Sequence, residues 1–159
     1  PAIPREFEVF ADSDWAANEH DRRSLSGGVF GLKSADWFNP VNWWSSLQKS
    51  LALSSCEAET ISLSQACRKA IGVHHVLKHA FPEMKFSFKG FGDNSASLFV
   101  EAGCSLRKIR HIQLSDLYCR TQKLIHWQKI PRHLNLADML THSLGKKNHN
   151  EFLKIAGIS

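Results

Sequence analysis

Short runs of alternating apolar and polar side chains fill the first third of the chain, and polar turns separate them. Such alternation is typical of strands with one buried and one exposed side. It predicts a strand at residues 6–11, which we expect to stop at the polar cluster 12–14. Two more strands are predicted at 26–32 and 41–46, with a turn at 39–40 before the second of them. Three consecutive strands joined by turns favour an antiparallel meander.

From Ser54 onward the apolar positions recur every three or four residues, which is the spacing of one face of a helix. Ser54 and Glu57 form a capping box at the start of this pattern, and Pro82 follows its end. The sequence therefore predicts a long amphipathic helix. Its apolar stripe contains Leu63, Ala66, Cys67, Ala70, Val73 and Leu77.

The second half of the chain alternates predicted strands with predicted helices. Strands are expected at 85–92 and 124–130, a short helix at 96–102, another helix at about 111–123, and a final helix that begins at Asn135. Strands joined by helical crossovers lie parallel to their neighbours. The order predicts an α/β protein with a mixed five-stranded sheet, three antiparallel strands followed by parallel crossovers, flanked by helices.

Composition narrows the class of protein. A chain of 159 residues with 43% hydrophobic content can build one core without disulfides or metals as staples, so we expect a single domain over 1–159, with 1–5 as a linker remnant. The first residue is Pro rather than Met, which suggests a fragment of a longer chain. The four cysteines lack zinc-finger spacing, and no apolar run approaches the roughly 20 residues of a membrane span. We expect an intracellular protein with reduced thiols.

The charge balance favours a polyanionic partner. Lys and Arg number 20 against 15 Asp and Glu, a formal net charge of +5, and nine His add further charge below neutrality. Basic proteins often only carry solvated lysines, so charge alone does not identify a nucleic-acid partner.

Four carboxylates stand at positions where an ordinary solvated acid is not expected. Asp12 and Asp93 each follow a predicted strand, and ligands of such sheets bind at the carboxyl ends of strands. Glu59 lies four residues before Leu63, on the apolar stripe of the long helix, where a charge needs a partner. The alternatives are Asx turns for the two aspartates and a helix-dipole interaction for Glu59.

Asp138 is the fourth candidate, and it lies in the first turn of the final predicted helix, three residues after Asn135. A helix-capping role is its alternative. Four carboxylates at one end of a sheet would repel strongly unless cations hold them, and hard oxygen ligands favour Mg²⁺ or Mn²⁺. Two such ions about 4 Å apart can activate water for phosphodiester cleavage. Asp14, two residues after Asp12, could assist a metal from a more distant position.

These residues lie in segments that resemble the ribonuclease H domain of copia-type long-terminal-repeat retrotransposons. The segments occur in the family's order and cover nearly the whole chain: ADSDWA, DRRSLSGGVFGL, NWWSSLQKSLALSSCEAETISLSQA, FGDNSAS, RKIRHI and LADMLTHSL. Some positions depart from the family pattern. Cys56 stands where Thr is usual, Gly92 where Cys is usual, and His142-Ser143 replaces the usual Lys-Pro.

The resemblance implies a ribonuclease H-like fold and an endonuclease that hydrolyses the RNA strand of RNA/DNA hybrids with two Mg²⁺ or Mn²⁺ ions. It assigns the catalytic and metal-binding roles to Asp12, Glu59, Asp93 and Asp138. It also implies a reverse transcriptase domain in the same polyprotein as partner, and a cytoplasmic location within virus-like particles, with the nucleus as the alternative.

Other residues are candidates for a supporting role. His133, in the loop before Asp138, could aid proton transfer or product release, or could simply meet phosphate. Predicted nucleic-acid contacts are Arg22, Arg23, Ser54, Ser55, Asn94, Arg107, Lys108 and Arg110. The serines and Asn94 are expected near sugar 2′-hydroxyls, which distinguish RNA from DNA. Solvated surface is the alternative for the arginines, with Arg23 paired to Asp21.

Two rival functions belong to other classes. A transposase or integrase shares this kind of fold, but its closing acid is usually Glu, whereas Asp138 closes the set here. The second rival is a ribonuclease H-like module that binds nucleic acid and has lost catalysis. The four retained carboxylates argue against that loss.

Overall fold

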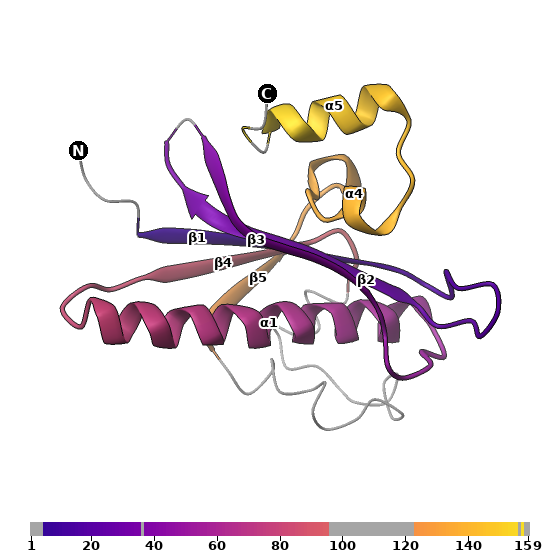
Figure 1. Ribbon diagram of the computed structural model, residues 1–159, viewed down its shortest axis with the longest axis horizontal. Coiled ribbons are helices and arrows are strands. Elements are labelled where there is room, and N and C mark those ends of the chain that lie inside the picture. The colour runs from indigo at the N-terminus through magenta and orange to yellow at the C-terminus, as the bar shows by residue number, and fades with distance from the viewer. Residues whose placement is uncertain (1–4, 36, 96–122, 156, 158–159) are drawn as a thin grey trace.

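The computed structural model describes residues 5–35, 37–95, 123–155 and 157 of the chain (Figure 1). The elements are β1 (Glu6–Asp14), β2 (Leu25–Lys33), β3 (Phe38–Leu47), α1 (Ser55–Ala80), β4 (Ser87–Gly92), β5 (Ile125–Lys129), the 3₁₀ helix η3 (Arg132–Leu134), α4 (Asp138–Thr141) and α5 (Lys146–Ile155). The helices expected at 96–102 and about 111–123 lie outside the described residues.

The five strands form one mixed sheet in the order β3-β2-β1-β4-β5. β1, β2 and β3 pair in antiparallel fashion, while β4 is parallel to β1 and β5 is parallel to β4. The expected meander with parallel crossovers is therefore confirmed. α1 lies along one side of the sheet, and α4 and α5 lie on the other (Figure 1).

Alternating side chains of β1 supply both cores. Phe7 and Val9 are buried on the side that α1 covers, together with Leu63 of that helix. Phe10 faces the opposite side, where Leu136 and Phe152 pack against it. β1 is the central strand of the sheet, so both of its faces are buried, and the alternation of its side chains decides which residues face each helical layer.

The first strand is longer than the sequence predicted. β1 continues through the polar cluster 12–14, because Asp12 and Asp14 pair with Gly27 and Leu25 of β2. Pairing with β2 satisfies the backbone there, and the Ser62 hydroxyl donates to the Asp12 carbonyl oxygen at 2.6 Å. The expected stop was therefore wrong, and Asp12 and Asp14 point to the same side of the sheet.

The third strand also begins earlier than expected, at Phe38, and runs through the predicted turn at 39–40. A bulge near Phe30/Gly31 shifts the register there, so that Gly31 is opposite Pro40 while Phe30 is opposite Asn42. Because β3 is an edge strand, the missing N–H of Pro40 costs little.

The long helix begins and ends as predicted. The Ser54 hydroxyl accepts a hydrogen bond from Glu57 N at 3.2 Å, and the Glu57 carboxylate accepts one from Leu53 N at 2.7 Å. The Glu57 carboxylate thus binds the N–H of Leu53, one residue before the Ser54 N–H that a standard capping box uses. In the described part of the chain, no helix combines the length and apolarity that a membrane span requires.

The final helix differs from the prediction, since two separate helices, α4 and α5, replace it. Asn135 begins no helix. Its side-chain oxygen accepts from Ala137 N at 3.2 Å, and its side-chain nitrogen donates to the Ala11 carbonyl of β1 at 3.1 Å. Asn135 thus ties the segment before α4 to β1 next to Asp12.

Candidate active site

Three of the four predicted carboxylates converge at one end of the sheet. Asp12 is on β1, Asp93 directly follows β4, and Glu59 is in the second turn of α1. Oxygens of the three groups all lie within 4.8 Å of one another. The two aspartates meet because β1 and β4 are parallel neighbours whose carboxyl ends share one edge.

Asp138 reaches the same place from α4. Its carboxylate, that of Asp12 and a ring nitrogen of His142 form a second group within the same 4.8 Å limit. Asp12 belongs to both groups and therefore lies between them. No described side chain caps the start of α4. The Asp138 carboxylate contacts Arg132 and His142 instead, so Asp138 does not act as a helix cap.

Asp12 is almost fully buried, and contacts from both layers hold it. Its side-chain oxygen Oδ2 accepts from the Thr141 hydroxyl of α4, while its backbone carbonyl accepts from Ser62 of α1. Burial raises the pKa of Asp12 to about 6; the Thr141 hydrogen bond lowers the pKa, and the neighbouring Asp93 raises it further.

Glu59 points at the sheet end rather than toward solvent. Its Oε1 accepts hydrogen bonds from the Ser13 hydroxyl at 2.9 Å and from Ser13 N at 3.2 Å. Burial raises the pKa of Glu59 well above its usual value, and the charges of Asp12 and Asp93 raise it further. A helix-dipole role alone leaves these contacts unexplained.

Asp93 is only partly buried. Burial again raises its pKa, against the nearby Arg132 cation, which lowers it. Three neighbouring carboxyl groups with raised pKa values form a site where negative charge is poorly compensated. Such a site favours an added cation.

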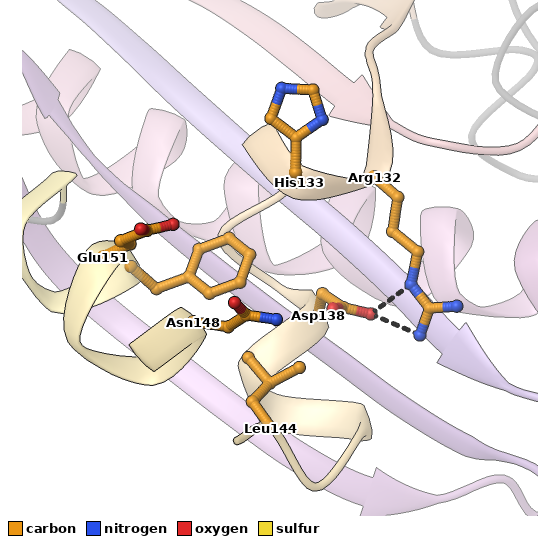
Figure 2. Close-up of a pocket in the computed structure, with 7 residues that line it drawn as sticks. Arg132, His133, Asp138, Leu144, Asn148 and Glu151 are labelled. Carbon is orange, nitrogen blue, oxygen red and sulfur yellow. Dashed lines mark hydrogen bonds and ion pairs between the residues drawn. The ribbon is translucent and has the colours of Figure 1, made fainter. Parts of the chain in front are cut away.

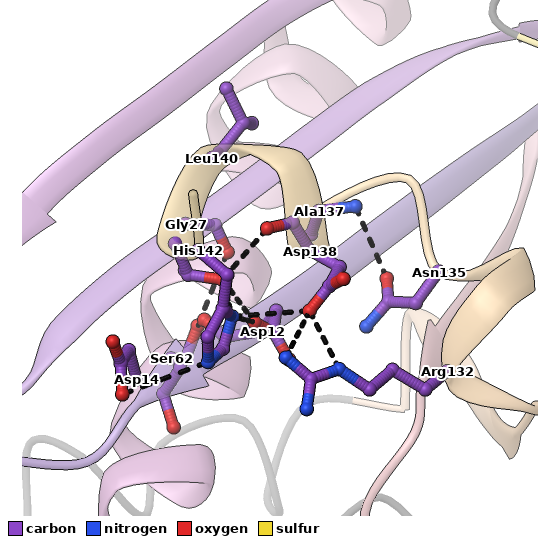
Figure 3. A network of polar contacts seen from close by, with 12 residues as sticks. Asp12, Asp14, Gly27, Ser62, Arg132, Asn135, Ala137, Asp138, Leu140 and His142 are labelled. Carbon is purple, nitrogen blue, oxygen red and sulfur yellow. Dashed lines mark hydrogen bonds and ion pairs between the residues drawn. The ribbon is translucent and has the colours of Figure 1, made fainter. Parts of the chain in front are cut away.

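Two basic side chains lie at the second group (Figure 3). Arg132 places Nε at 2.9 Å and Nη2 at 2.8 Å from Oδ1 of Asp138. The His142 ring nitrogen Nδ1 lies 3.1 Å from the same oxygen and 3.4 Å from Oδ2 of Asp12.

Neither basic residue was assigned a role from the sequence, where His142 appeared only as a departure from the family pattern. The i, i+4 spacing of Asp138 and His142 was the one available signal.

His133 lies in η3 and lines a pocket of about 290 Å³ with Arg132, Asp138, Leu144, Asn148, Glu151 and Phe152. In Figure 2 its ring points away from the Asp138 carboxylate. A role in proton transfer or product release therefore stays a prediction that would require this ring to turn.

The predicted nucleic-acid contacts that the structure describes lie in separate segments of the chain. Arg23 pairs with Asp21, with Nε 2.5 Å from Oδ2, as the alternative interpretation expected. The Ser54 hydroxyl caps α1, whereas Ser55 and Asn94 lie in the segments that carry Glu59 and Asp93. Arg22 is exposed in the loop after β1. Arg107, Lys108 and Arg110 lie outside the described residues.

Among curated proteins, two retrotransposon Pol polyproteins are similar to this chain over most of its length. It is 24% identical over 159 residues to the retrovirus-related Pol polyprotein from transposon RE2 of Arabidopsis thaliana, covering 96% of this chain and 10% of that protein. The corresponding protein from transposon RE1 is also 24% identical, with the same coverage. A shorter match, 40% identical over 62 residues, is to Secreted RxLR effector protein 161 of Plasmopara viticola and covers 39% of this chain and 41% of that protein. No family model matches.

Solved structures share the fold at low identity. The N-terminal RNase H domain of a Mycobacterium tuberculosis protein has a TM-score of 0.59 at 16% identity and covers 96% of both chains. RNase H1 of Halobacterium salinarum gives the same score and identity, with 94% of this chain and 98% of that one covered. The chain has the ribonuclease H fold and is similar in sequence to retrotransposon Pol polyproteins. This ribonuclease H-fold domain spans only 10% to 41% of the lengths of its curated relatives.

The donor set of the ribonuclease H-fold domain fits hard divalent cations. Asp12, Glu59 and Asp93 offer only carboxylate oxygens, the ligands that Mg²⁺ and Mn²⁺ prefer. The second group, Asp12, Asp138 and His142, adds one nitrogen. A bound cation would relieve the repulsion between neighbouring carboxylates that contributes to the raised pKa values of Asp12 and Glu59.

Proposed function

We propose that this domain is a metal-dependent endonuclease that hydrolyses the RNA strand of RNA/DNA hybrids. The observation that carries the proposal is the arrangement of four carboxylates in two groups with Asp12 in common. Two adjacent groups of oxygen ligands could hold the two closely spaced divalent ions that phosphodiester hydrolysis by a two-metal site uses. Mg²⁺ and Mn²⁺ are the proposed ions.

Each carboxylate is held in a way that suits this role. Thr141 orients Asp12 from α4, and Ser13 orients Glu59 from β1, so neither carboxylate has to reorganise to face the sheet end. When bound, the two ions supply an activated water and stabilise the leaving oxygen. Asp93 is the least buried of the central three carboxylates, so solvent and substrate can reach it most easily.

The substrate and setting belong to the same proposal. Relationship to Pol polyproteins supports a reverse transcriptase domain as partner and an RNA/DNA hybrid as substrate. A solved protein with the same fold, LC11-RNase H1 in complex with an RNA/DNA hybrid, has a TM-score of 0.56 at 14% identity. We propose that the domain acts in the cytoplasm, within virus-like particles of the element, with the nucleus as the alternative.

One observation favours a second candidate, a nucleic-acid-binding module without catalysis. Arg132 and His142 both bring basic groups to Oδ1 of Asp138, so this carboxylate has a partner without any metal ion. A domain that used these contacts permanently would bind hybrid but would not cut it.

Cleavage of a labelled substrate panel separates the two candidates. The domain is incubated with RNA/DNA hybrid, RNA/RNA and DNA/DNA duplexes and single-stranded RNA, in Mg²⁺, in Mn²⁺ and in a chelator. The endonuclease cuts RNA in the hybrid only, and only with metal. Binding without cutting in both metals would establish the silent module, and comparable cutting of duplex DNA would contradict the proposed substrate.

A further inference from the structure

The ring of His142 lies inside the carboxylate site, with its two nitrogens facing different partners (Figure 3). Nδ1 lies between Oδ1 of Asp138, at 3.1 Å, and Oδ2 of Asp12, at 3.4 Å. The Thr141 hydroxyl, which also donates to Asp12, is 2.9 Å from the same nitrogen. The nitrogen therefore lies where a ligand atom of an ion shared by Asp12 and Asp138 would lie.

The second nitrogen of the ring meets a carboxylate of its own. Nε2 lies 3.6 Å from Oδ1 of Asp14, which is partly exposed at the end of β1. Asp14 reaches the ring because β1 continues past Asp12, so that the two aspartates point to the same side. Histidines that bind metals generally present their other ring N–H to a carboxylate or carbonyl, which fixes the tautomer and the ring orientation.

The backbone holds the ring in this place. His142 is the residue after α4, and its N–H donates to the Asp138 carbonyl at 3.0 Å. That bond closes the single turn of α4 and brings the imidazole to the side of the helix where the Asp138 carboxylate lies. Its ring is partly buried against Asp12.

We propose that His142 Nδ1 is a nitrogen ligand of the ion held by Asp12 and Asp138, with Asp14 as the residue that positions the ring. This inference rests on the proposed metal site. An imidazole ligand suits Mn²⁺ better than Mg²⁺, which strongly prefers oxygen. The nitrogen therefore favours Mn²⁺ over Mg²⁺ at the site formed by Asp12, Asp138 and His142, which we call the second site. The group of Asp12, Glu59 and Asp93 remains an all-oxygen site.

The competing explanation is that His142 is only a counter-ion for the two aspartates. A bound cation would then expel the ring, and no metal–nitrogen bond would form. The two explanations make opposite predictions for the metal-bound protein, which a spectroscopic measurement can separate.

Pulsed electron paramagnetic resonance of the Mn²⁺-loaded domain detects nitrogen bound to the ion. The parent should show a ¹⁴N coupling that changes to ¹⁵N when histidine alone is labelled. His142→Gln should lose the coupling and bind the second Mn²⁺ at least about tenfold more weakly, since a ligand is removed. Asp14→Asn should keep the coupling but weaken that binding by about tenfold.

His149→Gln is the matched control, because His149 is an exposed histidine of α5 that belongs to neither carboxylate group. It should retain both the coupling and the affinity. Absence of a histidine coupling in the parent, or its persistence in His142→Gln, overturns the inference.

The outcome is independent of catalysis. A coupling in a domain that does not cut hybrid would uphold the ligand and reject the proposed activity. Cleavage of hybrid by a domain without the coupling would uphold the proposed activity and reject His142 as a ligand. Mn²⁺ affinity also serves as a readout, since it should fall more than Mg²⁺ affinity in His142→Gln.

Discussion

Asp12 on β1 is paired across the sheet with Gly27 on β2. A Cβ at Gly27 would lie 2.7 Å from the Thr141 side chain and 3.0 Å from that of Leu140. The missing side chain therefore lets α4 approach the sheet closely enough for Thr141 and Asp138 to reach Asp12. One glycine on a neighbouring strand thus sets the spacing of the second carboxylate group.

Gly27→Ala should accordingly separate α4 from the sheet. We expect a loss of about 1–3 kcal/mol in the free energy of unfolding, as for overpacking, and weaker Mn²⁺ binding. Urea unfolding and calorimetric metal titration measure the two effects. Gly72→Ala is the control, because a Cβ there meets nothing within 4 Å and sits in α1, so it should be neutral or stabilise by up to about 1 kcal/mol. Equal behaviour of the two variants would contradict the close approach.

The raised pKa of Asp12 predicts how stability changes with pH in a metal chelator. A carboxyl group with a folded pKa of about 6 and an ordinary value of 3.8 binds more protons when folded, so stability falls as pH rises through that interval. The contribution is at most about 3 kcal/mol between pH 4 and pH 7. Asp12→Asn should flatten this part of the profile in urea unfolding. An identical slope in the variant would show that Asp12 is not the group responsible.

Arg132 should compete with the metal for Asp138, because its Nε and Nη2 both approach Oδ1. Removing the cation in Arg132→Gln should tighten binding of the second Mn²⁺ severalfold, while Arg132→Lys keeps the charge and should change it less. Isothermal titration with Mn²⁺ gives both affinities. Weaker metal binding in Arg132→Gln would mean that Arg132 supports the site instead.

Hybrid binding should be mainly electrostatic, as the net charge of +5 suggests. Affinity should fall steeply as salt rises. The double substitution of Arg107 and Arg110 by Ala should reduce the slope of log affinity against log salt concentration by about 2, because each arginine is expected to contact one phosphate. Fluorescence anisotropy at several salt concentrations tests this. An unchanged slope would remove both arginines from the interface.

Local pattern was enough to predict most of the scaffold. The periodicity and caps of α1, the alternation in β1 and β2 and the crossover order are properties of neighbouring residues, so the sheet with its parallel strands followed from them. Asp12 and Asp93 could be placed together for the same reason, since both lie near the carboxyl ends of strands that the order makes parallel.

Long-range contacts decide the parts that sequence reasoning missed. β1 continues past Asp12 only because β2 pairs with it. Asn135 leaves the expected helix start to bind a carbonyl of β1, 124 residues away in the chain. The contacts of Arg132 and His142 with Asp12 and Asp138 likewise depend on how α4 and η3 pack on the sheet, and the i, i+4 spacing of Asp138 and His142 is only a partial sign of them.

The metal-site account makes Asp93 essential to chemistry but not to folding. Asp93→Asn keeps the shape of the side chain and removes one ligand charge from a crowded group, so the metal-free variant should be as stable as the parent or slightly more so. Glu57→Gln is the matched acid control, because Glu57 caps α1; it should lose roughly 1 kcal/mol at most and still cut.

The rate of RNA-strand cleavage in a labelled hybrid, measured with Mn²⁺ for the parent and for Asp93→Asn, tests the central claim most directly. The account predicts that the parent cuts, that the variant is slower by several orders of magnitude, and that both bind hybrid with similar affinity. Cleavage by Asp93→Asn at close to the parent rate would contradict it.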